Sequence, residues 1–144
     1  MLEWRIPTYQ EMISLLWGTA PQNGLSGLCK DHAVLKQAYR RVFSNHDVVC
    51  WSSTFDDGRV RVVDFSDGFC GAANANHSCF VRMVSTRRHS PAWQPGNASS
   101  ERFRPLKNAV VDEKTGLVWS KDVLNTRPYT FQELVSLMAI RKVA

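Results

Sequence analysis

The sequence lacks the features that mark membrane and exported proteins. It contains no apolar run of the roughly 20 residues that a membrane-spanning helix needs, and its first residues turn polar too early for a signal peptide. We therefore expect no membrane association. We also expect a cytoplasmic protein, unless a leader precedes these residues.

The sequence also lacks the high cysteine content of a disulfide scaffold, with four in 144 residues: Cys29, Cys50, Cys70 and Cys79. In a reducing compartment, such cysteines stay as thiols and do not form a disulfide framework. Cys50 lies in an apolar run and is typical of a core residue. Under oxidising conditions, Cys70 and Cys79 are the pair that we expect to form a disulfide.

No motif for catalysis or for a cofactor is present. The four histidines lack the spacing of metal ligands, and Cys70, His77 and Cys79 would supply only part of a four-ligand zinc site. There is no G-x-S-x-G elbow and no glycine-rich phosphate loop, and the aspartates do not assemble the six or so oxygen ligands of calcium. We predict neither an enzyme nor a cofactor or metal site.

What the sequence does have is a core-forming composition and a surplus of positive charge. At 144 residues and 44% hydrophobic, it is long enough for one domain with its own core. The formal net charge of +5 suits a polyanionic partner such as nucleic acid, a sulfated glycan or an acidic protein surface. The same charge can equally serve solubility alone.

The centre of the chain predicts a meander of short strands. Residues 48–54, 59–65 and 80–84 alternate or concentrate apolar and β-branched side chains. Asp57-Gly58 and Asp67-Gly68 supply the positive φ of tight hairpin turns. A second strand pair is expected further on, at residues 109–112 and 117–119, around the turn 113–116.

Helices are expected on both sides of this meander. Thr8 and Glu11 form a capping box, and so do Thr130 and Glu133, so helices should start there and run to about residues 17 and 142. The two openings align without gaps, which predicts two similar helices packed on one sheet. A further helix is expected at residues 31–43, where apolar positions recur at helical spacing.

The domain organisation follows from these elements. Residues 1–84 form the main part of the domain, and residues 108–144 complete it with a strand pair and a helix. Between them, residues 85–107 are rich in Pro, Ser, Arg and Gly without periodicity, and this composition predicts an exposed connector.

Four segments occur in an order that points to a known family. They are Trp4-Arg5-Ile6-Pro7-Thr8, Trp51-Ser52-Ser53-Thr54, Val63-Asp64-Phe65-Ser66-Asp67-Gly68 and Val81-Arg82-Met83-Val84. Together they resemble the family named for the carboxy-terminal domain of the Legionella collagen-like protein. The resemblance implies an α+β, C-type-lectin-like fold, in which a small twisted antiparallel sheet is flanked by two to three helices. It also implies glycan binding, as in bacterial surface proteins, and hence a secreted or surface location if a leader was removed.

The order of the remaining segments departs from that family. Residues 112–119 and 130–133 look like the start of a family member, but here they come last. The chain is then a circular permutant, a domain that exchanges its C-terminal segment with a neighbouring chain, or a slice across two tandem domains. We favour one complete set of parts, permuted or swapped. Because exchanged segments favour assembly, we expect a homo-oligomer, a dimer or a trimer.

The candidate ligand-binding residues form a basic set with one tryptophan. The cations are Arg82, Arg87, Arg88, Arg102, Arg104 and Lys107. Trp93 lies in the polar connector beside Arg87, Arg88 and His89. An exposed tryptophan among cations suits glycan stacking or a protein contact, and it can equally fold down to pin the connector.

Two functional hypotheses follow. The first is a non-catalytic module that binds a glycan, in particular an anionic polysaccharide, through this basic face. The second is a cytoplasmic interaction protein of mobile-element or phage origin that docks on a host protein, for example on an acidic surface of that host protein. Nucleic-acid binding has only the charge in its favour, and we do not expect it.

Overall fold

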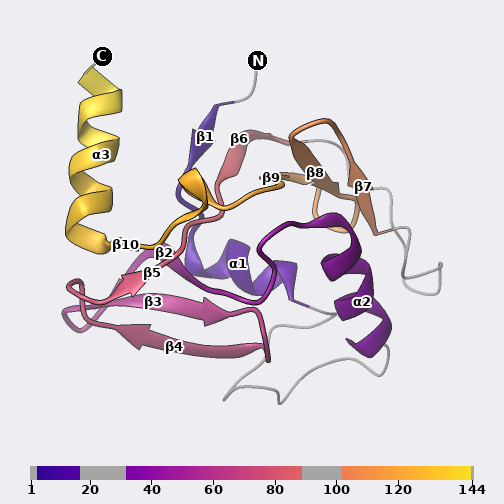
Figure 1. Cartoon of the computed structure of the whole chain (residues 1–144), viewed down its shortest axis with the longest axis horizontal. Coiled ribbons are helices and arrows are strands. Elements are labelled where there is room, and N and C mark those ends of the chain that lie inside the picture. Colours follow the sequence, from indigo (N-terminus) through magenta and orange to yellow (C-terminus); the bar gives the residue numbers. More distant parts are fainter. Residues whose placement is uncertain (1–2, 17–31, 89–101, 144) are drawn as a thin grey trace.

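The computed structural model describes residues 3–16, 32–88 and 102–143, which form a mixed α+β fold with antiparallel sheets (Figure 1). The described elements, in chain order, are β1 (Trp4–Arg5), α1 (Tyr9–Leu15), α2 (His32–Val42), β2 (Val49–Asp56), β3 (Arg59–Asp64), β4 (Phe69–Ala73), β5 (Ser78–Cys79), β6 (Val84–Arg88), β7 (Phe103–Pro105), β8 (Ala109–Asp112), β9 (Leu117–Ser120), the 3-10 helix η2 (Leu124–Thr126), β10 (Tyr129–Thr130) and α3 (Phe131–Val143). The α+β class expected from the sequence is confirmed.

The central meander is a three-stranded sheet in the order β2-β3-β4. Its first turn is the predicted Asp-Gly hairpin, with φ of 52° at Asp57 and 79° at Gly58. In the second turn, Gly68 has a φ of 84°, and its N–H donates to the Asp64 carbonyl at 2.8 Å. The strands predicted at residues 48–54 and 59–65 are confirmed as β2 and β3.

This sheet has a hydrophobic cluster on each face. On one face, Val60 and Val62 belong to a cluster with Trp51, Phe131 and Leu134, which brings in the start of α3. The opposite face carries a second cluster, with Cys50 and Val63 of the sheet, Met12 and Leu15 of α1, and Tyr39 of α2. α1 and the first turn of α3 therefore contact opposite faces of this sheet, whereas most of α3 extends away from it (Figure 1).

Both predicted capping boxes are present. At α1, the Glu11 N–H donates to the Thr8 hydroxyl at 3.2 Å, and the Thr8 N–H donates to the Glu11 carboxylate at 2.9 Å. At α3, the same two bonds join Thr130 and Glu133 at 3.1 and 2.8 Å. These bonds satisfy N–H groups that the first turn of a helix leaves without a partner.

The second sheet has five strands in the order β1-β6-β9-β8-β7. The strand pair predicted at residues 109–112 and 117–119 is confirmed as β8 and β9. The Gly116 N–H closes their turn on the Asp112 carbonyl at 2.7 Å. This pair lies inside the sheet, between β6 and β7.

The exposed connector predicted for residues 85–107 is wrong in two places. Its start belongs to β6, where Ser85 is buried, and the buried residues Arg102 and Phe103 lead into β7. Residues 104–107 are exposed, as expected. The remaining connector residues, 89–101, lie outside the described residues.

The strand predicted at residues 80–84 is also wrong for most of its length. Phe80 makes an isolated bridge to Cys50, and regular pairing begins only at Val84. Between them, the Val81 and Met83 carbonyls accept from the N–H groups of Leu124 and Ser120. The backbone here crosses from one sheet to the other, and its hydrogen bonds go to the C-terminal segment and not to one neighbouring strand.

A basic cleft and a tryptophan cleft

α2 and β7 pack against each other (Figure 1). A cleft with two cationic residues lies between them. It has a volume of about 270 Å³. We name it the basic cleft, and its lining residues are Ala38, Arg41, Val42, Phe103, Pro105 and Lys121.

The apolar side of the basic cleft belongs to an aromatic cluster. Phe103 is buried, and its ring meets Phe43 edge-on at a centroid distance of 5.4 Å and Tyr39 at 6.2 Å. Tyr39 in turn stacks on Phe43 at 4.6 Å. Burial raises the pKa of Tyr39 to about 12, so its hydroxyl stays neutral and adds no negative charge beneath the cleft.

Arg41 and Lys121 have no ion pair within the part of the chain that the structure describes. The neighbouring Arg40 differs, because its guanidinium binds the Asp47 carboxylate at 2.8 Å. The Lys121 backbone is fixed on both sides: its carbonyl accepts from the Ser44 N–H at 3.0 Å, and its N–H donates to the Asn108 carbonyl at 3.2 Å. The backbone that carries Lys121 is therefore fixed, and the side chains of Arg41 and Lys121 are available to an anion.

Arg82 is not part of a surface, which corrects its prediction as a ligand-binding residue. Only 1% of Arg82 is exposed, and its guanidinium donates to the carbonyls of Ser44, Asn45, Ser120 and Lys121. These bonds fasten the end of α2 to the end of β9. Its guanidinium also lies 4.8 Å from the centroid of the Phe43 ring. Arg82 therefore has a structural role: it holds the segments that carry Arg41 and Lys121 next to each other.

Arg102 is corrected in the same way. It is fully buried and pairs with the buried Asp112 carboxylate through two bonds, at 2.9 and 2.8 Å. Its remaining N–H groups donate to the carbonyls of Ser14 and Leu16 at the end of α1. This arginine therefore joins α1 to the five-stranded sheet.

The other predicted binding residues divide into two groups. Arg104 and Lys107 are exposed at β7 and in the turn after it, and Arg104 binds the Glu113 carboxylate at 2.6 Å. Arg87 and Arg88 belong to β6, and their side chains lie outside what the structure describes, as does Trp93 entirely. Arg41 and Lys121 were missed because nothing in their local sequence links the end of α2 to the end of β9.

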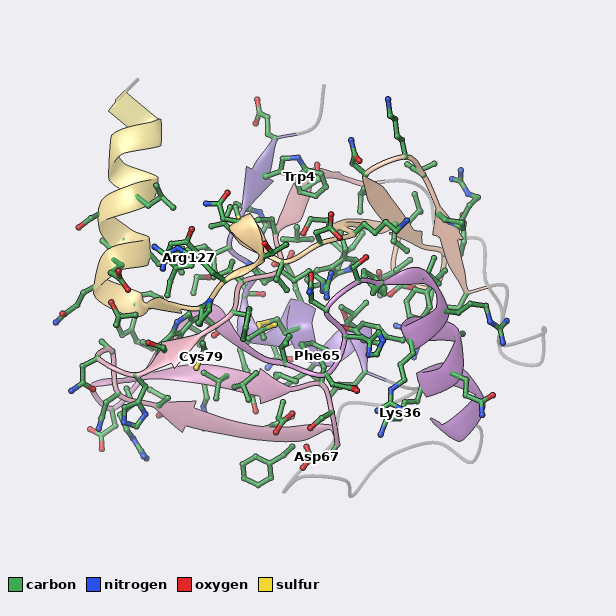
Figure 2. The ribbon with its side chains drawn as sticks, viewed as in Figure 1. Trp4, Lys36, Phe65, Asp67, Cys79 and Arg127 are labelled. Carbon is green, nitrogen blue, oxygen red and sulfur yellow. The ribbon has the colours of Figure 1, made fainter. Side chains whose placement is uncertain are left out.

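A second cleft lies on the other side of the segment that carries Lys121. It has a volume of about 220 Å³. We name it the tryptophan cleft, and its lining residues are Trp4, Met83, Asn108, Ser120, Asp122 and Leu124. Trp4 is only half-buried, and its side chain extends from the edge strand β1 (Figure 2).

A larger hollow of about 560 Å³ borders the first turns of α3. Arg127 stacks over the Tyr129 ring at 3.9 Å there, and its guanidinium lies 4.0 Å from the Glu133 carboxylate (Figure 2). Because an acidic group faces the cation, this hollow is less suited to an anion than the basic cleft.

The described cysteines are free thiols. Burial raises the pKa of Cys50 to about 12 and that of Cys79 to about 11, and it also raises the pKa of Cys70. The core position predicted for Cys50 is confirmed. Cys70 and Cys79 lie on β4 and β5 and form no disulfide. Among the described residues, His, Cys, Asp and Glu side chains form no group of three that could hold a metal ion.

Comparisons with known proteins add no further information. Neither the scan of protein-family models nor the searches of curated proteins and of solved structures found a match. Within the described residues, no helix is long and apolar enough to cross a membrane. The functional argument therefore depends on the two clefts.

Proposed function

We propose that this chain is a non-catalytic module that binds an anionic glycan in the basic cleft. The observation that carries the proposal is a pair of cations, Arg41 and Lys121, beside the apolar side chains of Val42 and Phe103. Neither cation has an ion pair with any residue that the structure describes. Carboxylate or sulfate groups of a sugar can bind the two cations, while the C–H faces of its ring contact the apolar side chains.

The C-type-lectin-like fold and the permuted or exchanged segments belong to the same proposal. The resemblance of residues 4–84 to a lectin-like family supports the fold assignment. Antiparallel sheets with helices packed against them are compatible with it. The glycan assignment, however, depends on the cleft and is tested there.

The test measures binding of two anionic tetrasaccharides, one from hyaluronan and one from polygalacturonate, with neutral maltotetraose as the control ligand. We expect binding of the anionic ligands at low salt and a strong loss at high salt, because salt screens exposed charges. Arg41→Ala and Lys121→Ala should each weaken binding about fivefold, the effect of roughly 1 kcal/mol.

The matched control variant is Arg59→Ala. Arg59 is exposed on the β2–β3 hairpin, it has no ion pair among the described residues, and its removal changes the net charge by the same amount. We expect Arg59→Ala to bind nearly as the wild type does. An equal loss in all three variants would mean diffuse attraction without a site, and no binding of either anionic ligand would reject the proposed function.

A second candidate function has one observation in its favour. Phe55 is 63% exposed and Val135 is 50% exposed, and the Phe55 ring meets Phe131, one turn before Val135, at 5.3 Å. Such an apolar patch suits a protein partner. If the chain docks on a host protein here, Phe55→Ser should abolish capture of a defined partner in a pull-down, and Arg41→Ala should not.

A further inference from the structure

The side chains of the tryptophan cleft combine an aromatic surface with hydrogen-bonding groups. Trp4, Met83 and Leu124 are its apolar lining, and Asn108 and Asp122 offer amide and carboxylate groups. A pyranose ring has the matching chemistry: its C–H face packs on an indole, and its hydroxyls donate to a carboxylate and exchange bonds with an amide. The volume of about 220 Å³ is below the 300 to 1,000 Å³ of drug-sized sites, which suits one ring.

The charge of this cleft favours an uncharged ring. No cation is among its lining residues, and Asp122 is exposed with no ion pair among the described residues. A carboxylate or sulfate group placed here would meet the Asp122 carboxylate and be repelled. The tryptophan cleft therefore favours an uncharged sugar ring, whereas the basic cleft favours an acidic one.

The two clefts are neighbours that share one wall. Ser120 and Asp122 line the tryptophan cleft, while Lys121, between them in the sequence, lines the basic cleft. Likewise, Asn108 in the turn from β7 to β8 lines the tryptophan cleft, while Pro105 at the end of β7 lines the basic cleft. The bond from the Lys121 N–H to the Asn108 carbonyl joins the two segments into a single ridge.

We infer that the tryptophan cleft binds an uncharged pyranose unit of the same glycan whose acidic unit lies at Arg41 and Lys121, so that the ligand crosses the ridge and alternates acidic with neutral sugars. This inference rests on the proposed function. It adds a specificity that net charge alone does not give, because a glycan with an acidic group on every ring must place one of them against Asp122.

The two anionic tetrasaccharides separate these cases. Hyaluronan alternates a uronate with a neutral amino sugar, whereas polygalacturonate carries a carboxylate on every ring. We expect the hyaluronan tetrasaccharide to bind at least about fivefold more tightly at the same salt concentration, although it carries half the charge. Tighter binding of tetragalacturonate, in keeping with its charge, would overturn the inference and leave the basic cleft as the proposed site.

Variants test the tryptophan cleft itself. Asp122→Asn should weaken hyaluronan binding about fivefold, because a carboxylate accepts stronger hydrogen bonds than an amide. If Asp122 only lies near the ligand, removing its negative charge should tighten binding instead, so the sign of the change decides. The matched control is Asp57→Asn, at an exposed hairpin position with a φ of 52° that asparagine tolerates.

The salt dependence distinguishes the two clefts. Trp4→Phe and Asp122→Asn should lower the affinity for hyaluronan without reducing its dependence on salt, whereas Lys121→Ala should reduce that dependence. Melting temperatures of each variant show whether it is folded. If Lys121→Ala weakens binding while Trp4→Phe and Asp122→Asn leave it unchanged, the inference is wrong and the proposed function stands.

Discussion

Arg102 and Asp112 form an ion pair that the protein surrounds completely. Both side chains are 0% exposed, and the guanidinium also donates hydrogen bonds to two carbonyls at the end of α1. Removing one partner of such a pair leaves a buried charge without compensation. We predict that Arg102→Ala lowers the free energy of unfolding by roughly 3 to 5 kcal/mol, measured by urea denaturation.

The control for this prediction is the pair Arg104–Glu113, an arginine and a carboxylate close to the buried pair in the chain. The Arg104 side chain is half-exposed, so water reaches this pair. Arg104→Ala should change stability by no more than about 1 kcal/mol, because water screens an exposed pair. Equal effects of Arg102→Ala and Arg104→Ala would contradict the structural role given to the buried pair.

At the scale of single elements, the two capping boxes offer a matched comparison of α1 and α3. The Glu11 carboxylate also accepts two bonds from the Arg5 guanidinium, at 2.7 and 2.6 Å. Burial alone would raise the pKa of Glu11, but the bonds from Arg5 and Thr8 outweigh it and lower the pKa. Glu133 in α3 is exposed and has a lowered pKa through its bonds with Thr130.

We predict that Glu11→Gln destabilises the protein by about 1 kcal/mol at pH 7 and that this cost disappears in acid. A carboxyl with a lowered folded-state pKa stabilises the fold above its unfolded pKa, near 4.5, and loses this effect as the pH falls through the folded value. Melting temperatures from pH 7 down to pH 3 measure the difference, and Glu133→Gln should show a smaller one. A constant difference across that range would show that the charge of Glu11 does not matter.

The elements also show which parts of the fold could be predicted from the sequence. Helix starts and the β8–β9 pair were found because their signals lie within a few residues: a capping box, or a turn between two β-branched runs. β4 was missed because Phe-Cys-Gly-Ala-Ala has little strand propensity, and it pairs only because β3 lies beside it.

The site was less predictable than the fold, and for a related reason. Arg82 and Arg102 were assigned to a surface because arginine is seldom buried. However, the carbonyls that accept from Arg82 lie more than 35 residues away in the sequence, and the Leu16 carbonyl that accepts from Arg102 lies more than 80 residues away. The cations that do line the basic cleft, Arg41 and Lys121, meet only when α2 and the end of β9 pack together.

At the scale of the whole molecule, the C-terminal segment is a structural centre. β8 and β9 lie between β6 and β7, and Trp51 on β2 donates to the Tyr129 carbonyl at 2.7 Å. Phe131 and Leu134 complete the cluster on one face of the meander. Every one of these contacts joins parts of a single chain, and the same contacts would form between chains if the segment were exchanged.

Solution mass therefore separates the permutant from the exchanged form. In place of the homo-oligomer expected from the sequence, we predict that light scattering gives the 16.3 kDa of one chain, because all of these contacts form within one chain. Deletion of residues 108–144 should abolish the far-UV and near-UV circular dichroism of a folded protein, because it removes two inner strands of the larger sheet. A mass of two or three chains that is lost on deletion would mean segment exchange, and the two clefts would then combine residues of different chains. A truncated chain that remains folded as a monomer would show that residues 108–144 belong to a separate unit, since a sheet cannot lose β8 and β9 from its interior and keep β6 and β7 in place.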